Sequence, residues 1–113
     1  MDLKTYFVYI LSSRSRNLYT GLTSQIEICV WKHKTKSLGG HTAKYNIDRL
    51  VYFEEHTTAS EAIAREKEIK SWRRELRISL IESMKPGWVD MSEGWYDDEL
   101  MAEEKRQKQI PSG

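Results

Sequence analysis

Two tyrosines near the start of the chain are the first residues whose types and spacing suggest shared chemistry. Tyr9 lies in a run of β-branched and aromatic residues, and Tyr19 lies ten residues later in a second such run. If the two runs pair as strands, both phenol groups can lie on one sheet. Tyrosine also favours strands for structural reasons, and a half-buried phenol commonly satisfies its hydroxyl locally. The tyrosines alone therefore leave a catalytic and a structural role open.

Glu66 is a carboxylate in an otherwise apolar pattern. Ile63 and Ile69 lie three residues to either side of it, which places it on the apolar face of a predicted helix. Burying an unpaired charge is costly, so a carboxylate there needs either a hard divalent metal ion or a basic side chain. A position at the edge of the face, in contact with solvent, is the equal alternative.

Cys29 and His33 are four residues apart and therefore share one helical face. Two ligands make a weak metal site, and no further Cys or His stands at a diagnostic spacing. We favour His33 as a phosphate ligand or proton carrier over zinc binding. Simple packing between a helix and a sheet explains the same histidine equally well.

Basic residues alternate with a tryptophan over residues 65–77. Lys70 and Arg73 lie closest to the indole of Trp72. Cations interleaved with an aromatic ring suit phosphate contact and base stacking. Glutamates are interspersed in the same stretch, so a solvated helix with internal ion pairs is an equal alternative.

The net charge of +1 is unevenly distributed along the 113 residues. Residues 85–113 hold seven acidic and four basic side chains, a net of −3, which leaves +4 on the rest of the chain. A basic body is compatible with a polyanionic partner. We expect neither a signal peptide nor a membrane-spanning segment, since no apolar run approaches about 20 residues. With one cysteine, the sequence predicts a cytoplasmic protein with no membrane partner.

The elements that would position these residues follow from hydrophobic periodicity. We expect strands over 6–12, 18–23 and 49–55, helices over about 25–36, 58–72 and 74–83, and a loop over 41–48. This order, β-β-α-β-α-α, predicts an α+β fold: a small three-stranded, mainly antiparallel sheet flanked by helices. The length allows one domain, residues 1–95, followed by a charged tail over residues 96–113.

Local signals refine these elements. Thr23 or Ser24 can cap the first helix, and Glu27 follows Ser24 by three residues, which predicts a capping box. Thr58 is the expected N-cap of the next long helix. Gly21 inside a strand indicates a bulge or a close backbone approach. Residues 88–95, which carry two tryptophans, are expected to pack back onto the domain.

Taken in order, these segments resemble the GIY-YIG nuclease superfamily. The resemblance is carried by Val8-Tyr9-Ile10, Tyr19-Thr20-Gly21, Val30–Lys34, Thr42–Asn46, Leu50–Glu54, Ala64–Trp72, Leu80–Glu82 and Pro86–Trp88. The two-tyrosine motif alone is weak, whereas the ordered series with matching spacing is specific and runs from about Tyr6 to Trp95. It looks closest to the small stand-alone members, one branch of which cleaves single-stranded DNA.

The resemblance implies a divalent-metal-dependent DNA endonuclease that hydrolyses a phosphodiester by in-line attack. Tyr9 and Tyr19 would line the active site, one of them helping to deprotonate the attacking water. Glu66 would bind one Mg²⁺ or Mn²⁺, and His33 would lie beside the scissile phosphate. The metal would offset the negative charge that develops on the phosphoryl group.

One departure from the family concerns the first helix. The family places an arginine ten residues after the second tyrosine to hold the phosphate, and this chain has Cys29 there. Cysteine is mostly uncharged and makes no bidentate phosphate contact. By analogy with an oxyanion donor, the loss would cost on the order of 10²–10³ in rate. Arg14 or Arg16, from the turn after the first strand, could partly substitute.

The first hypothesis is therefore an impaired DNA endonuclease. A catalytically inactive nucleic-acid-binding module on the same scaffold is the alternative, and an interaction domain without nucleic acid is the third. The residues expected to contact DNA are Arg14, Arg16, Lys44, Tyr45, Lys70, Trp72 and Arg73.

Overall fold

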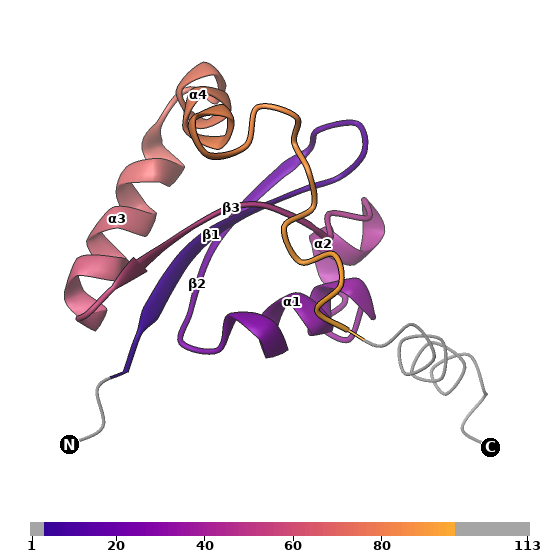
Figure 1. The fold of residues 1–113 in the computed structure, drawn as a ribbon, viewed down its shortest axis with the longest axis horizontal. Coiled ribbons are helices and arrows are strands. Elements are labelled where there is room, and N and C mark those ends of the chain that lie inside the picture. Colours follow the sequence, from indigo (N-terminus) through magenta and orange to yellow (C-terminus); the bar gives the residue numbers. More distant parts are fainter. Residues whose placement is uncertain (1–3, 97–113) are drawn as a thin grey trace.

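A central antiparallel sheet organises the computed structural model, which describes residues 4–96. The elements are β1 (Tyr6–Ser12), β2 (Leu18–Thr23), α1 (Ile26–Lys34), α2 (Gly40–Lys44), β3 (Arg49–His56), α3 (Ala59–Ser71) and α4 (Arg74–Met84). The strand order is β2-β1-β3, and both pairings are antiparallel (Figure 1). The predicted α+β class is confirmed. Of the tail predicted over residues 96–113, only Tyr96 lies within the described residues.

β1 is the middle strand because its side chains are apolar toward both faces. Successive side chains point to opposite sides, so Val8 and Ile10 face α3 and α4, whereas Tyr9 and Leu11 face α1. The first cluster is completed by Val51, Tyr52, Ala62, Ile69, Ile81 and Trp88, and the second by Ile26, Val30, Ile47 and Leu50. Helices therefore cover both faces of the sheet (Figure 1).

The start of α1 differs from the expected capping box. The N-cap is Gln25, which makes no side-chain capping bond. Thr23 Oγ1 instead accepts a hydrogen bond from the Gln25 backbone N at 3.0 Å, and Ser24 is exposed. The predicted capping box of Ser24 and Glu27 was thus wrong. The side chain of Thr23, at the end of β2, makes the hydrogen bond that stabilises the turn into α1.

Two other local expectations had different outcomes. Thr58 caps α3 as predicted, and its Oγ1 accepts a hydrogen bond from the Glu61 backbone N at 3.2 Å. The predicted loop over residues 41–48 was wrong in part, because it contains most of the short helix α2. That helix follows Gly39 at φ 63°, a left-handed conformation that glycine adopts at little cost.

After α4 the chain returns across the end of the sheet to α1 (Figure 1). Trp88 is 6% exposed, and Met91 is half-buried with its backbone N bonded to Leu50 O at 2.8 Å, as expected of a segment that packs back. Trp95 is more exposed and meets Tyr96 edge-on. Within residues 4–96, no helix combines the length and apolar character needed to span a bilayer.

Candidate active site

The two tyrosines lie on the face of the sheet that α1 covers. Tyr9 is paired with Gly21 and Tyr19 with Leu11, so the rings are diagonal neighbours, with centroids 6.3 Å apart. The imidazole of His33 lies near both, 6.2 Å from the Tyr9 ring and 5.4 Å from the Tyr19 ring. β1, β2 and α1 thus bring three of the predicted site residues together.

Gly21 makes room for Tyr9. A Cβ atom at position 21 would lie 2.4 Å from Tyr9 Oη and 2.5 Å from its Cζ, too close for any unshifted side chain. The register between β1 and β2 is continuous through Gly21, so there is no bulge. The expected bulge or close backbone approach at this glycine is thus wrong: the group that approaches it closely is the side chain of Tyr9.

A chain of hydrogen bonds runs through the hydroxyl of Tyr9. Cys29 Sγ donates to Tyr9 Oη at 3.1 Å, and Tyr9 Oη lies 3.4 Å from His33 Nε2. On the other side of the imidazole, His33 Nδ1 lies 3.1 Å from Thr42 Oγ1. Cys29 and His33 contact the same phenol because they are one turn apart on α1.

Thr42 is a site residue that the sequence interpretation did not single out. It is the buried residue of α2, a segment that was expected to be a loop. The available signal was weak: a hydroxyl within the motif around residue 44, with no periodicity to show that it is buried. Its partner His33, 5% exposed, is one of the three buried residues of α1.

Burial sets the protonation states of this chain. It lowers the pKa of His33 below its ordinary value, so the imidazole is neutral at pH 7. Burial also raises the pKa of Tyr9 far above 10, and contacts with Cys29, Tyr19 and the charge of Glu66 raise it further. Tyr9 is therefore a protonated phenol at neutral pH.

Glu66 reaches the site from α3, which packs on β2 and β1. Its side chain is 19% exposed, and its charge acts on Tyr9. Lys70 Nζ lies 3.5 Å from Glu66 Oε2, so the partner of this carboxylate is a basic side chain, one of the two partners expected from the sequence. The flanking residues differ: Ile69 is buried, whereas Ile63 is 41% exposed.

The donor set fits a hard divalent ion of the Mg²⁺ kind. Among residues 4–96 no three His, Cys, Asp or Glu side chains cluster as a complete metal cage. Mg²⁺ commonly uses one or two carboxylates and completes its shell with waters and substrate phosphate, so Glu66 alone suits it. Zinc at Cys29 and His33 fits poorly, because both side chains are engaged with Tyr9.

The two arginines of the β1–β2 turn lie elsewhere. The Arg16 guanidinium is stacked over the Trp88 ring at 4.4 Å, and Arg14 lines a separate pocket together with Lys34. Within residues 4–96, no contact joins either arginine to Tyr9. Their geometry therefore gives no support to the idea that they replace the family arginine.

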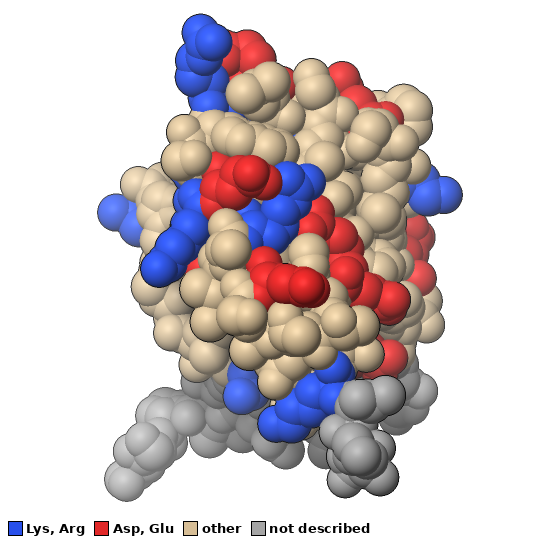
Figure 2. All heavy atoms as spheres, turned by 90° about the vertical axis from the view of Figure 1, so that its left-hand side faces the viewer, with Lys and Arg blue, Asp and Glu red and all other residues tan. Residues whose placement is uncertain are grey.

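The other predicted DNA contacts are spread over the surface. Tyr45 is exposed, with Lys44 Nζ 5.4 Å from its ring centroid. Trp72 packs against the core and carries the Arg65 guanidinium over its ring at 5.1 Å, which reduces its availability for base stacking. Arg73 is exposed at the start of α4. Figure 2, which faces the side of α3, shows basic and acidic side chains interspersed.

Comparison with known proteins identifies the family of this chain. The GIY-YIG catalytic domain matches residues 5–78. The chain therefore belongs to the GIY-YIG family, whose catalytic domain is of nuclease type.

Its relatives are UPF0213 proteins. The chain is 40% identical over 81 residues to one from Staphylococcus epidermidis, covering 68% of this chain and 94% of that protein. It is 41% identical over 81 residues to one from Haloquadratum walsbyi, covering 68% and 86%. A solution NMR structure of a UPF0213 protein from Bacillus halodurans is 26% identical, with a TM-score of 0.49 and coverage of 80% and 97%.

Proposed function

We propose that the chain is a divalent-metal-dependent DNA endonuclease that accepts single-stranded DNA. The observation that carries this proposal is the position of the Tyr9 hydroxyl, hydrogen-bonded to Cys29 and His33 on the α1 face of the sheet, with the Glu66 carboxylate of α3 near enough for its charge to raise the pKa of Tyr9. GIY-YIG nucleases typically depend on a divalent metal, which supports Mg²⁺ or Mn²⁺ as the cofactor.

In this proposal Tyr9 transfers a proton and does not act as a phenolate. His33 Nδ1–H donates to Thr42 Oγ1, which leaves the lone pair of Nε2 directed at the Tyr9 hydroxyl. Tyr9 Oη takes a proton from the attacking water while its own proton passes to Nε2. Because the imidazole starts neutral, it can accept that proton without a cation beside the phenol.

Glu66 would hold the metal ion, which when bound supplies positive charge to offset the charge gathering on the phosphoryl group. Lys70 is the cation that lies beside this carboxylate. Its long side chain can turn from Glu66 to a phosphate oxygen, and we assign it the phosphate contact that Cys29 does not make. As a point charge it lacks the two parallel bonds of a guanidinium, so an impaired rate remains the expectation.

A nucleic-acid-binding module without catalysis is the second candidate. Cys29 favours it, because the thiol occupies the family's arginine position and donates to Tyr9. The two candidates differ in one measurement: both bind DNA in a salt-dependent manner, and only the first cleaves it.

Substitution of Glu66 tests the proposal. We expect the native chain to cleave labelled single-stranded DNA with Mg²⁺ or Mn²⁺ and to stop when a chelator is added. Glu66→Gln should abolish this cleavage while costing only about 0.5 kcal/mol of stability, since its ion-pair partner Lys70 is half-exposed and the two atoms are 3.5 Å apart.

Glu75→Gln, at an exposed glutamate of α4, is the matched control and should cleave as the native chain does. Unchanged metal-dependent cleavage by Glu66→Gln would refute the metal assignment. A native chain that binds DNA without cleaving it would establish the binding module instead.

A further inference from the structure

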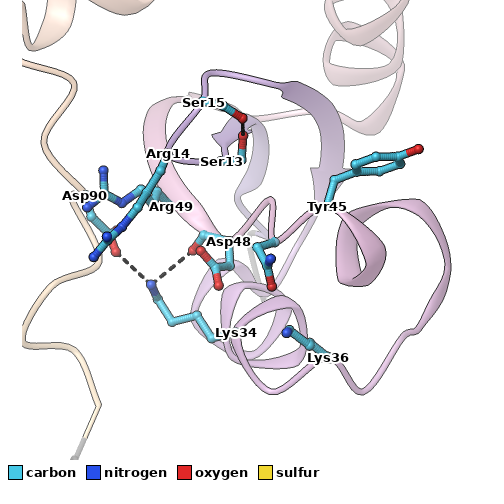
Figure 3. Close-up of a pocket in the computed structure, with 10 residues that line it drawn as sticks. Ser13, Arg14, Ser15, Lys34, Lys36, Tyr45, Asp48, Arg49 and Asp90 are labelled. Carbon is cyan, nitrogen blue, oxygen red and sulfur yellow. Dashed lines mark hydrogen bonds and ion pairs between the residues drawn. The ribbon is translucent and has the colours of Figure 1, made fainter.

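A polar pocket lies beyond the end of β1, outside the catalytic site (Figure 3). Its volume is about 560 Å³. The walls come from residues 13–15 of the β1–β2 turn, residues 34 and 36 at the end of α1, residues 45, 46, 48 and 49 before and at the start of β3, and Asp90. None of the catalytic residues described above lines it, so the proposed hydrolysis leaves this pocket without a role.

Its charged lining is predominantly basic. The charged residues are Arg14, Lys34, Lys36, Arg49, Asp48 and Asp90, a formal balance of +2. Lys34 is engaged: its Nζ lies 2.7 Å from Asp90 Oδ2 and 3.0 Å from the carbonyl oxygen of Asp48. One cation thus neutralises one carboxylate, and the other three cations outnumber the remaining carboxylate, that of Asp48, by two.

Arg14, Lys36 and Arg49 are the three cations that remain. Within residues 4–96, none of their side chains makes a hydrogen bond or an ion pair. Figure 3 shows Arg14 and Arg49 on one side of the pocket, next to Asp90, and Lys36 on the other side, with Lys34 between them. Uncompensated cations around a concavity concentrate positive potential in it and attract anions.

The basic surface continues beyond this pocket. Arg14 and Arg49 also line a smaller neighbouring hollow of about 130 Å³, together with Arg16 and Trp88. Arg16 is held over the Trp88 ring, so its guanidinium has a defined place at the edge of this hollow. Because Arg14 and Arg49 line both hollows, the two form one continuous basic surface along the end of the sheet, which we call the basic track.

The basic track lies at the end of β1 that follows the catalytic Tyr9. Ser13 follows Tyr9 by four residues, and a strand rises about 3.3 Å per residue, which gives a separation of about 13 Å. A nucleic-acid strand advances about 3.4 Å per nucleotide in B-form DNA, so this separation corresponds to about four nucleotides. A strand bound at Tyr9 can therefore reach the pocket with a phosphate that is not the one cleaved.

We propose that this pocket binds backbone phosphates of the substrate strand, a few nucleotides from the cleaved bond, through Arg14, Lys36 and Arg49. The inference rests on the proposed function for the identity of the strand. Guanidinium groups suit phosphate because they offer two parallel N–H donors. The hydroxyls of Ser13 and Ser15, 3.1 Å apart, add short donors at the same wall. A free mononucleotide has the same phosphate chemistry, and the experiment separates the two ligands.

The test measures binding of a labelled single-stranded oligonucleotide by fluorescence anisotropy over a range of salt concentrations, with a chelator present. Replacing all three cations by Gln should weaken binding at low salt about tenfold or more. The slope of log K against log salt should fall by about 2, since each neutralised phosphate contributes about 0.7. Arg14→Gln with Lys36→Gln, both at exposed positions, is the second variant and should lower the slope by about 1.4. Lys4→Gln, an exposed cation near the other end of β1, is the matched control and should change neither quantity.

The outcomes separate this inference from the proposed function. The inference would be overturned if the triple and double variants bound the oligonucleotide with native affinity and a native salt slope. It would also be overturned if a mononucleotide competed as well as an unlabelled oligonucleotide at the same phosphate concentration. Bis(p-nitrophenyl) phosphate is too small to reach both sites, so the variants should hydrolyse it as the native chain does. If the native chain cleaves nothing while its binding depends on the pocket, the endonuclease proposal fails and the pocket stands.

Discussion

Cys29 and Tyr9 show how one side chain alters a whole site. The thiol donates to the phenol at 3.1 Å from a position where the family has an arginine. The phenol is uncharged at neutral pH, because burial and its contacts raise the pKa of Tyr9 far above its ordinary value. The proton path from Tyr9 to His33 is thus present, whereas Cys29 makes no bidentate contact with phosphate. An arginine at position 29 would supply that phosphate contact.

Cys29→Arg is expected to raise DNA cleavage by about 10² or more. The guanidinium would offer two donors to a phosphate beside His33 and would lower the pKa of Tyr9 through its charge. Cleavage kinetics under one metal concentration provide the measurement. Cys29→Lys adds charge without the planar fork and should give a smaller gain.

The competing expectation is overpacking. Cys29 is half-buried, so a larger side chain could press on Tyr9 and lower the melting temperature. A melting curve of each variant therefore accompanies the kinetics. A well-folded Cys29→Arg variant without any gain would show that more than the arginine has been lost, in favour of the binding module.

The pH dependence of cleavage tests His33. Burial lowers the pKa of His33 below 6.5, and only the neutral imidazole accepts a proton from Tyr9. We expect kcat/KM to fall on the acidic side with a midpoint below pH 6.5 and to be level from there toward pH 8. Thr42→Val removes the acceptor for Nδ1–H and should lower the plateau about tenfold through a misoriented ring, at unchanged fold. An acidic midpoint above pH 6.5 would contradict the assignment of His33.

At the scale of elements, Gly21 links β2 to the catalytic geometry. Gly21→Ala is expected to displace the Tyr9 ring, because the new Cβ would lie 2.4 Å from Oη. Cleavage should drop at least tenfold and stability by about 1–3 kcal/mol, the usual cost of overpacking. Activity and a urea unfolding curve measure the two effects.

Gly87→Ala provides the matched control for this substitution. A Cβ at position 87 would meet its nearest neighbour, a Val89 methyl, at an ordinary 3.7 Å. This variant should keep native stability and activity. If Gly21→Ala also keeps native stability and activity, the Tyr9 ring can move aside without loss of cleavage. The proposed proton path through the Tyr9 hydroxyl would then be wrong.

The strands and α3 could be predicted because their signals are local. Continuous apolar runs gave the bounds of β1 and β2 as the structure has them, and the Thr58 hydroxyl marked the start of α3. α2 could not be predicted, since five residues with a single buried side chain leave no periodicity.

The same division applies to the site. Cys29 and His33 were expected on one face because helical spacing is local. The roles of Thr42 and Arg49 depend on contacts between segments. Lys70 was predicted as a DNA contact, and its pairing with Glu66 is an i,i+4 contact within α3 that helical spacing also allows. Arg49 reads as an ordinary polar residue at the start of a strand. Arg49 lines a pocket only because the β1–β2 turn and the end of α1, both remote from it in sequence, lie beside it in the fold.

At the scale of the molecule, residues 86–96 join parts that are distant in sequence. Asp90 is the main attachment: its Oδ1 accepts hydrogen bonds from the backbone N of Leu50 at 3.1 Å and from Ser92, and its Oδ2 pairs with Lys34. Burial alone would raise the pKa of Asp90, but the bonds from Lys34 and Ser92 outweigh it and hold that pKa below its usual range. One carboxylate thus fastens this segment to both α1 and β3.

Asp90→Ala is expected to lower the free energy of unfolding by about 2 kcal/mol and to loosen residues 86–96, measured by urea unfolding and amide hydrogen exchange. The stability contributed by a carboxylate with a lowered folded pKa is present above its unfolded pKa of about 3.9 and is lost as the pH falls through the folded value. The difference between the native chain and Asp90→Ala should therefore be full at pH 7 and shrink below about pH 4.

Glu93→Ala, at an exposed residue of the same segment, is the control and should match the native chain at every pH. Equal stability of Asp90→Ala and the native chain at pH 7 would mean that Trp88 and Met91 hold the segment without the carboxylate.

Asp90→Ala also frees Lys34, whose charge is neutralised in the native pocket. The variant should therefore bind the single-stranded oligonucleotide more tightly at low salt, with a salt slope steeper by about 0.7, even as its fold becomes less stable. A gain in binding together with a loss in stability distinguishes release of Lys34 from simple unfolding, which would weaken both.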